Sequence, residues 1–389
     1  MVKAKDMAFM VGARQARRHF LLAMASAGVL TLAACQTAPR GPGPGAVGPI
    51  GPVQPIEGDR HLVAVIVPLT GGDGAIGQSI ANAANLALFD TGDKSIRLNA
   101  YDSAAPGGAA AATAQALRDG AGLILGPLLA DDVRAAAPVA RRAGVPVIAF
   151  SNDEGVAGGG AFIMGFTPDQ SIDRVVQFAR GKGAARFGAL VPSGLYGKRA
   201  SQAVVSAVRR AGGRLNGIET FDRSSASARL AAGRLKAKGA MDAVLIADSG
   251  RIAALAAPML PGAVKLMGTE LWASDKLLGK TPALRGAWYA AAPDARFAQL
   301  STRYRARYGK SPYRLASLGY DAVLLAVRSS RSWPMGRPFP ARTLVARDGF
   351  AGVDGNFRFG SDGIAERLLE VRQVTPLGTS VVARAGTAF

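Results

Sequence analysis

Residues 61–90 contain an apolar run, a glycine-rich stretch and a helical pattern, in that order. Leu62–Val67 is apolar and β-branched and has the length of a strand, which is typical of a strand buried on both faces. Pro68 lacks an N–H donor, and the glycines after it favour a loop, so the strand ends there. From Ala75 the apolar residues recur at helical spacing. This unit opens a wound α/β domain, whose ligands bind at the carboxyl edge of the sheet.

The same alternation of strand and helix continues along most of the chain. It predicts parallel sheets with right-handed crossovers, in two similar α/β halves near 62–166 and 167–280. From Arg342 onward the pattern becomes that of antiparallel strands around glycine turns. The predicted strands are 96–101, 122–125, 145–150, 187–191, 214–220, 243–247, 264–267, 284–291, 356–359 and 368–374. The later predicted helices are 109–118, 130–142, 170–181, 196–211, 226–238, 251–259, 296–308 and 315–329.

The N-terminus has the pattern of an export signal. A basic stretch, 1–18, precedes an apolar stretch, 21–33, that is too short to span a bilayer. The sequence Leu-Ala-Ala-Cys that ends at Cys35 resembles the bacterial lipobox, which implies cleavage before Cys35 and diacylation of its thiol. Arg17 and Arg18 lie in a sequence that resembles the twin-arginine export signal, with an ordinary Sec signal as the alternative.

Cysteine and histidine are too scarce for several kinds of chemistry. Cys35 is the only cysteine, so a lipidated mature chain has no disulfide, no thiol nucleophile and no cysteine metal site. Of the two histidines, His19 leaves with the signal and His61 directly precedes the first strand. These counts argue against a Ser-His-Asp triad and a histidine-rich zinc site, although not against carboxylate chemistry. We therefore expect no metal, no cofactor and no enzymatic activity.

Two further features of the sequence are a Pro/Gly-rich tether and a basic net charge. Residues 36–60 form a Pro/Gly-rich linker that could extend roughly 75 Å from a membrane at about 3.1 Å per residue. The formal net charge of +20 is compatible with binding to anionic lipid, an acidic protein partner or an acidic polymer. Such a charge can also result from the base composition of the genome alone. No basic run is interleaved with aromatic residues, so we expect no nucleic-acid partner.

Five short motifs resemble, in order, the type I periplasmic binding proteins of the leucine/isoleucine/valine-receptor group. That resemblance implies two Rossmann-like α/β lobes with parallel sheets, joined by a three-segment hinge around a ligand cleft. The motifs are 67–71 (VPLTG) with Gly77, 125–128 (LGPL), 144–148 (GVPVI), 192–197 (PSGLYG) and 318–322 (LGYDA).

The resemblance also places domain boundaries. The signal peptide takes residues 1–34, and the lipidated cysteine and tether take 35–60. Lobe 1 is expected at 61–166 plus 281–337, and lobe 2 at 167–280 plus 338–389. The chain then returns between the lobes near Lys280 and Arg337.

Part of the cleft pattern of the amino-acid receptors is lost. In those receptors a hydroxyl residue after the Gly-Pro-type turn holds the ligand's carboxylate, whereas this chain has Leu129 and Ala130 there, which cannot donate a hydrogen bond. Ser151 and Asn152 keep polar groups at the next strand end, but Asp153 beside them would repel a carboxylate.

Other cleft positions are kept. Thr70 lies in the first loop, and Tyr196 matches a cleft aromatic of the receptors. Glu270 matches a glutamate that would pair with the ligand's α-ammonium group. Structural roles stay open for three of these residues: Ser151 as a helix cap, Tyr196 as core packing and Glu270 as a solvated loop charge.

The anchor, the tether and the altered pocket together resemble the penicillin-binding-protein activators. These outer-membrane lipoproteins have the same fold, contact a peptidoglycan synthase and work by binding alone. A tethered body gains effective concentration on a membrane-held partner. Gln36 after the lipidated cysteine, in place of Asp, favours outer-membrane sorting by resemblance to enterobacterial lipoproteins. We therefore expect a periplasmic, lipid-anchored activator of a peptidoglycan synthase.

Two alternatives remain at this stage. The first is a solute receptor that feeds an ABC permease and binds a small amino acid or amide. The second, more remote, is a nicotinamide-dependent oxidoreductase, because 72–77 fits G-x-G-x-x-G and Asp102 ends the next strand. Against that enzyme, 68–71 separates the strand from the motif, and neither a Tyr-x-x-x-Lys pair nor a central histidine is present.

The lipobox can be tested directly. Cys35→Ser removes the acyl acceptor, so the expressed chain should move from the membrane fraction to the released periplasmic fraction and lose incorporation of labelled palmitate. Thr37→Ala is the control and should stay with the membranes. A Cys35→Ser chain that still carries lipid would contradict the prediction.

Overall fold

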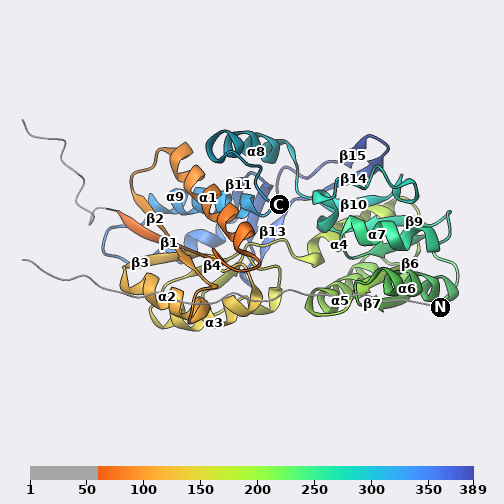
Figure 1. Cartoon of the computed structure of the whole chain (residues 1–389), viewed down its shortest axis with the longest axis horizontal. Coiled ribbons are helices and arrows are strands. Elements are labelled where there is room, and N and C mark those ends of the chain that lie inside the picture. Colours follow the sequence, from red (N-terminus) through yellow and green to blue (C-terminus); the bar gives the residue numbers. More distant parts are fainter. Residues whose placement is uncertain (1–59) are drawn as a thin grey trace, which may run out of the picture. The chain divides into compact units, whose positions relative to one another are not determined.

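The computed structural model describes residues 60–389, and Figure 1 labels its helices and strands. The expectations for the signal, Arg17, Arg18, Cys35 and the tether lie outside these residues. No helix among residues 60–389 is both long and apolar enough to span a membrane. The strands are β1 His61–Val67, β2 Ile96–Asp102, β3 Ala121–Leu125, β4 Val147–Ala149, β5 Ala161–Ile163, β6 Arg186–Pro192, β7 Arg214–Phe221, β8 Ala243–Ile246, β9 Lys265–Gly268, β10 Trp288–Ala291, β11 Phe350–Gly352, β12 Gly355–Phe359, β13 Ala365–Arg367, β14 Glu370–Thr375 and β15 Gly378–Ala383. The α-helices are α1 Gly74–Thr91, α2 Gly108–Arg118, α3 Ala130–Arg142, α4 Pro168–Gly181, α5 Leu195–Arg210, α6 Ser225–Ala237, α7 Gly250–Ala256, α8 Ala295–Tyr308 and α9 Ala316–Ser330.

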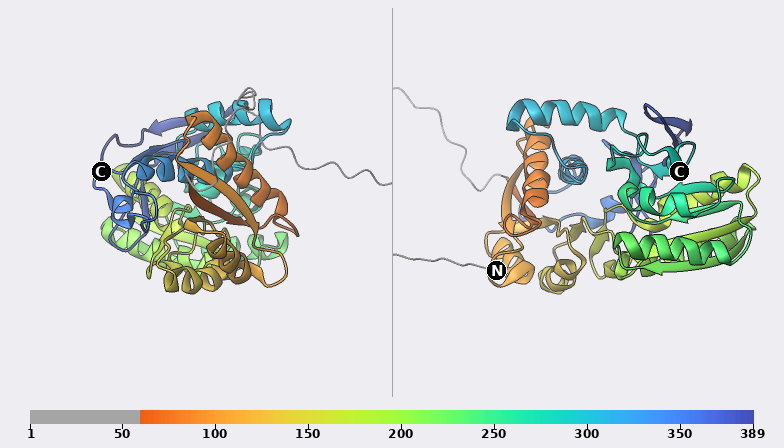
Figure 2. Two further views of the ribbon diagram at one scale, coloured as in Figure 1. Left: turned by 90° about the vertical axis from the view of Figure 1, so that its left-hand side faces the viewer. Right: turned by 45° about the vertical axis from the view of Figure 1, so that its right-hand side comes forward.

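The first lobe is built on a five-stranded parallel sheet in the order β2-β1-β3-β4-β5. Every residue of β1 is buried, as its apolar sequence predicts. Val63, Val65 and Val67 pack on the side of α1 and α9, while Leu62 and Ile66 pack on the side of α2 and α3. Figure 2 shows α9 beside α1 on that first side.

The second lobe is built on a seven-stranded sheet in the order β15-β14-β10-β9-β8-β6-β7. Strands β6 to β10 are parallel, whereas β14 and β15 add to the edge in antiparallel fashion. A separate three-stranded antiparallel sheet contains β11, β12 and β13. The predictions of parallel α/β lobes and of antiparallel strands near the C-terminus are therefore confirmed.

The observed packing places both points at which the chain returns from one lobe to the other later in the sequence than expected. β10 pairs with β9 and β14, so residues 288–291 belong to the second lobe and the chain returns after Ala291 instead of near Lys280. The later part of the chain also stays longer in the first lobe than expected. Phe350, Phe357 and Phe359 pack into the core of that lobe, so the chain leaves it after β13 and not near Arg337.

Two polar side chains join the three crossing segments of the hinge. Gln170 donates to the carbonyl oxygen of Ala365 at 2.6 Å and accepts from the backbone N–H of Arg367 at 2.8 Å, which connects the first crossing to the third. Arg372, 3% exposed, donates to the carbonyl oxygen of Ala292 at 2.8 Å and forms an ion pair with Asp294. This pair connects the second crossing to the third.

In each lobe, a glycine allows a helix to pack closely against the end of the strand before it. A Cβ atom at Gly77 in α1 would lie 1.7 Å from the carbonyl oxygen of Pro68, and one at Gly197 in α5 would lie 1.5 Å from that of Pro192. Both helices therefore approach the Val-Pro end of the preceding strand too closely for any other residue. The glycines at these positions have a packing role.

Gly77→Ala and Gly197→Ala should each lower the free energy of unfolding by roughly 1–3 kcal/mol, because the new methyl group must push backbone apart. Gly233→Ala in α6 is the matched control, since a Cβ there meets no atom within 4 Å. That change should be neutral or stabilising by up to about 1 kcal/mol. Urea denaturation measures all three. Equal effects at the three glycines would contradict the packing role.

Candidate ligand pocket

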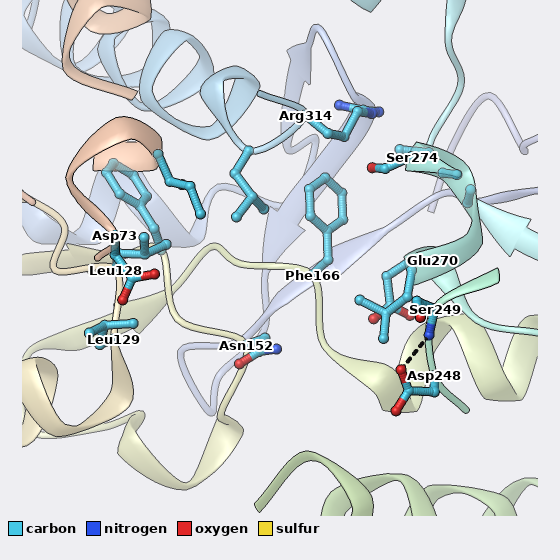
Figure 3. Close-up of a pocket in the computed structure, with 17 residues that line it drawn as sticks. Asp73, Leu128, Leu129, Asn152, Phe166, Asp248, Ser249, Glu270, Ser274 and Arg314 are labelled. Atoms are coloured by element: carbon cyan, nitrogen blue, oxygen red, sulfur yellow. Dashed lines mark hydrogen bonds between the residues drawn. The ribbon is translucent and has the colours of Figure 1, made fainter. Parts of the chain in front are cut away.

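A cavity of about 460 Å³ opens between the carboxyl edges of the two sheets, and residues of both lobes line it (Figure 3). Parallel strands of both lobes end here, which is where ligands of such sheets bind. The lining residues are Asp73, Ile76, Leu128, Leu129, Phe150, Asn152, Phe166, Asp248, Ser249, Glu270, Leu271, Ala273, Ser274, Ala291, Ala292, Arg314 and Leu315.

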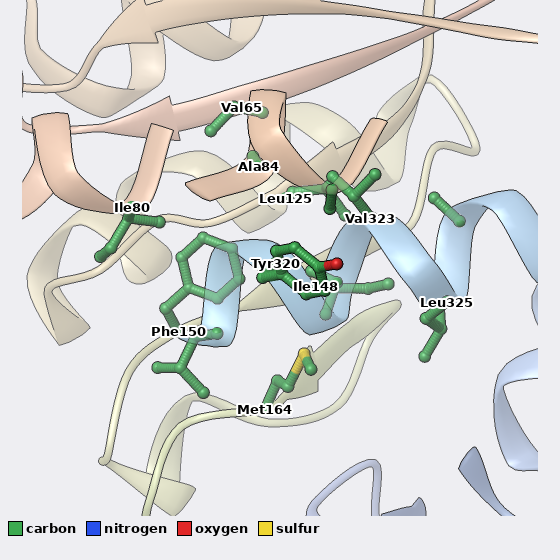
Figure 4. Close-up of a cluster of buried hydrophobic side chains, with 14 of the residues drawn as sticks. Val65, Ile80, Ala84, Leu125, Ile148, Phe150, Met164, Tyr320, Val323 and Leu325 are labelled. Carbon is green, nitrogen blue, oxygen red and sulfur yellow. The ribbon is translucent and has the colours of Figure 1, made fainter. Parts of the chain in front are cut away.

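The walls of the pocket are mainly apolar. Phe150 belongs both to the wall and to the core of the first lobe, so packed side chains fix its position (Figure 4). Phe166 lies on the first crossing segment and, with Leu128 and Leu129, adds further apolar surface. Such walls bind the apolar body of a small molecule, and the few polar groups then fix its orientation.

Glu270 is a polar anchor of the second lobe. It begins a 3₁₀ helix, Glu270–Ser274, directly after β9. Ser171 donates a short hydrogen bond to one carboxylate oxygen, and the Tyr196 hydroxyl donates to the other at 3.1 Å. Burial raises the pKa of Glu270 to about 7. No Lys, Arg or His of residues 60–389 forms an ion pair with this carboxylate, so a ligand could supply the missing donor.

Tyr196 remains a neutral hydrogen-bond donor. Its hydroxyl lies 3.1 Å from the Thr269 hydroxyl, and burial together with the Glu270 charge raises the pKa of Tyr196 well above its usual value. The phenol therefore keeps its proton near neutral pH and can donate to Glu270.

Two other charged lining residues, Asp248 and Arg314, are already paired with other groups. Asp248 accepts from Arg223 at 2.7 Å and from the backbone N–H of Ser249. Arg314 forms an ion pair with the fully buried Asp354 and lies over the Phe297 ring at 4.3 Å. Glu270 is thus a partly buried lining carboxylate that a ligand's positive group or donor would meet without competition from a paired cation.

Three of the seven expected site residues line the pocket: Leu129, Asn152 and Glu270. Tyr196 lies behind Glu270 and holds it, so its role in the structure is to support the anchor. Ala130 begins α3 next to Leu129 and is not among the lining residues. The alternative that Glu270 is a solvated loop charge is wrong, because the hydroxyl groups of Ser171 and Tyr196 donate to its two carboxylate oxygens and it lines the pocket.

The remaining expectations for the cleft need correction. The Thr70 hydroxyl donates to Asp102 at 2.7 Å, and the Leu69 N–H donates to the same carboxylate, so Thr70 closes the first loop and does not line the pocket. Ser151 is buried and accepts from the N–H of Asp153 in a local turn, whereas Asp153 caps the 3₁₀ helix Glu154–Val156, so Ser151 is neither a pocket residue nor the helix cap. Asp153 does not face a ligand as a free charge, because Arg134 pairs with it.

Two further sequence features also have structural roles. Asp102, the expected ribose ligand of the nicotinamide alternative, is occupied by the first loop, and Gly77 of the same motif packs on Pro68. His61 is the first residue of β1 and not the residue before it. Its ring stacks on Trp333 at 3.8 Å, and its Nε2 donates to the Trp333 carbonyl oxygen at 2.8 Å.

Sequence reasoning missed several residues of the site. Phe150 and Asp248 each follow a strand at the carboxyl edge, so their positions after the fourth and eighth strands could have identified them. Phe166, Ser171 and Arg314 come from a crossing segment and helix starts, and no local pattern marks them.

Comparison with known families now identifies the fold family. The profile described as "Periplasmic binding protein" matches residues 62–378, which is most of the chain. The chain belongs to this family. Its proteins bind ligands and are not enzymes, and membership implies that the folded body works in the periplasm. The resemblance of the short motifs to this family is thereby confirmed, and the link to a peptidoglycan synthase stays a prediction.

Solved structures show the same architecture. A solute binding protein of an ABC transporter from Rhodopseudomonas palustris BisB5, in complex with 3,4-dihydroxybenzoic acid, aligns with a TM-score of 0.68 and 21% identity over 85% of this chain and 98% of its own. A leucine binding protein from Thermotoga maritima aligns with a TM-score of 0.63 and 21% identity, over 84% of this chain and 99% of its own. A third structure is the branched-chain amino acid transporter substrate binding protein from Streptococcus pneumoniae in complex with isoleucine. It aligns with a TM-score of 0.61 and 18% identity, over 83% of this chain and 99% of its own. Identities this low show the fold alone.

One curated relative matches part of the chain. It is an uncharacterized protein of Rickettsia prowazekii (strain Madrid E), 23% identical over 160 residues. The match spans 41% of this chain and 43% of that protein, so it carries no argument about function.

The raised pKa of Glu270 predicts a pH dependence of stability. Between the ordinary pKa near 4.5 and about 7, the unfolded state loses this proton while the folded state keeps it, so folding weakens as pH rises through that window. Glu270→Gln should remove this contribution and flatten the decline. Urea denaturation at pH 4.5, 6 and 7.5 measures the difference between the two proteins, which isolates Glu270 from other titrating groups. Parallel pH curves for both proteins would contradict the raised pKa.

Proposed function

We propose that this protein is a periplasmic solute-binding protein that delivers a small, mainly apolar molecule to an ABC permease. The observation that supports it best is the pocket of about 460 Å³, which is lined by both lobes and has apolar walls and one enclosed carboxyl anchor. A ligand held by both lobes favours the arrangement in which they meet, and a permease can recognise that arrangement. The ABC-transporter proteins among the structural neighbours support the same proposal.

The chemistry of the pocket favours an apolar molecule that carries an amino or hydroxyl donor. The donor would pair with Glu270, and the apolar body would contact Phe150 and Phe166. Leu129 and Ala130 offer no side-chain donor to an α-carboxylate, so an amine should fit better than the corresponding amino acid. The neighbours are solved in complex with 3,4-dihydroxybenzoic acid and with isoleucine, two small molecules that each carry a carboxylate, so the proposed amine differs from both in lacking that group.

A second candidate is the activator of a peptidoglycan synthase. The loss of side-chain donors at Leu129 and Ala130, together with the lipobox at Cys35 and the tether after it, supports this hypothesis. In that case the body would be anchored to a membrane, most simply the outer one, and would bind the synthase without needing a solute.

Calorimetric titration distinguishes these functions. We expect 3-methylbutylamine to bind more tightly than leucine, which has the same apolar body and an added carboxylate. Glu270→Gln should weaken amine binding at least tenfold, because a buried ammonium group would lose its charged partner. Ser380→Ala, at an exposed position of β15 that does not line the pocket, is the control and should change affinity little.

The alternative outcome is equally clear. If no amine, amino acid or aromatic acid binds, while the full chain captures a purified bifunctional peptidoglycan synthase, the transport function is wrong and the activator hypothesis is favoured. Binding that is unchanged in Glu270→Gln would show that the ligand does not use the pocket anchor as proposed.

A further inference from the structure

Asp153 is a buried carboxylate with arginine partners on two different helices. It is 2% exposed, and Arg134 of α3 approaches it at 2.5 Å while Arg199 of α5 approaches it at 2.9 Å. The N–H of Gly155 also donates to it at 3.0 Å. A buried carboxylate with two charged donors is fixed in place, and removal of a partner is costly because the remaining charge stays buried.

The two arginines belong to different lobes. α3 connects β3 to β4 in the first sheet, and Asp153 precedes Val156, which packs in the core of the same lobe. α5 connects β6 to β7 in the second sheet, and its Ala203 and Val204 pack in the second core. The Arg134–Asp153 pair therefore lies within one lobe, whereas the Arg199–Asp153 pair joins the two.

The joining pair lies beside the pocket. Asn152, which lines the pocket, directly precedes Asp153, and Arg199 lies one helical turn after Tyr196, which holds Glu270. The contact can form only when the pocket sides of α3 and α5 are near each other. We propose that Arg199 is a positioning residue: through Asp153 it holds the lobes together around the pocket and so sets the affinity for solute. The affinity part of this proposal rests on the proposed function, and the contact between lobes does not.

The chain provides a matched set of variants. Arg199→Gln removes the partner in the second lobe, and Arg134→Gln removes an equal charge from the same carboxylate within the first lobe. Gly155→Ala offers an independent route, because a Cβ at this position would lie 2.0 Å from the Arg199 guanidinium and would displace it without loss of charge.

Spin-label distances test the contact without any ligand. The full chain carries Cys35→Ser, with labels introduced by Arg142→Cys at the end of α3 and Lys236→Cys in α6, both exposed sites. Arg199→Gln and Gly155→Ala should shift the distance distribution relative to the parent and broaden it. Arg134→Gln should leave the distribution unchanged. An unchanged distribution in Arg199→Gln would overturn the proposal.

Calorimetry with 3-methylbutylamine tests the effect on affinity. Arg199→Gln should raise Kd about fivefold or more, the usual lower range of coupling between distant sites. Arg134→Gln should change Kd by less than about twofold, because it leaves the contact between lobes intact. Equal losses in both variants would overturn the positioning role. If distances shift but the amine binds to none of the proteins, the contact is supported and the proposed ligand is wrong.

Discussion

The structure depends on parallel strands that are buried on both faces. Such strands need helices on each side of the sheet, and the helical crossovers bring the carboxyl ends of the parallel strands of a lobe to the same edge. β1 is such a strand: its residues are all buried, and its apolar side chains alternate between two layers of helices. Because both lobes follow the same plan and their carboxyl edges share one cavity, the pocket is a product of the topology. The side chains at those edges then decide what it can bind.

Glu270 illustrates how the pocket balances burial against binding. Hydroxyl groups of Ser171 and Tyr196 donate to its oxygens, but neither supplies a positive charge, so burial raises the pKa of this carboxyl to about 7. A cationic ligand would favour the ionised form and pair with it. Under the proposed function, the same group would lower the stability of the free protein and would stabilise the complex with a cationic ligand, as perturbed groups at functional sites often do.

Much of the fold could be predicted from sequence, because apolar periodicity distinguishes strands from helices residue by residue. The returns of the chain could not, since the short apolar run of β10 fits either sheet and its neighbours are chosen by tertiary packing. The site divides in the same way. Asn152 and Glu270 follow strands and could be found, whereas Arg314 and the partners of Asp153 are brought there by helices distant in sequence.

The hydrogen bonds of Gln170 and Arg372 have a mechanical consequence. Three separate peptide links would each bend on their own and would allow the halves of the protein to slide or twist in several ways. Because these side chains hydrogen-bond the three crossing segments to one another, the segments must change conformation together, as in a single hinge. We therefore expect the two lobes to move relative to each other mainly by rotation about one axis, so that a solute bound between them would act on that single rotation.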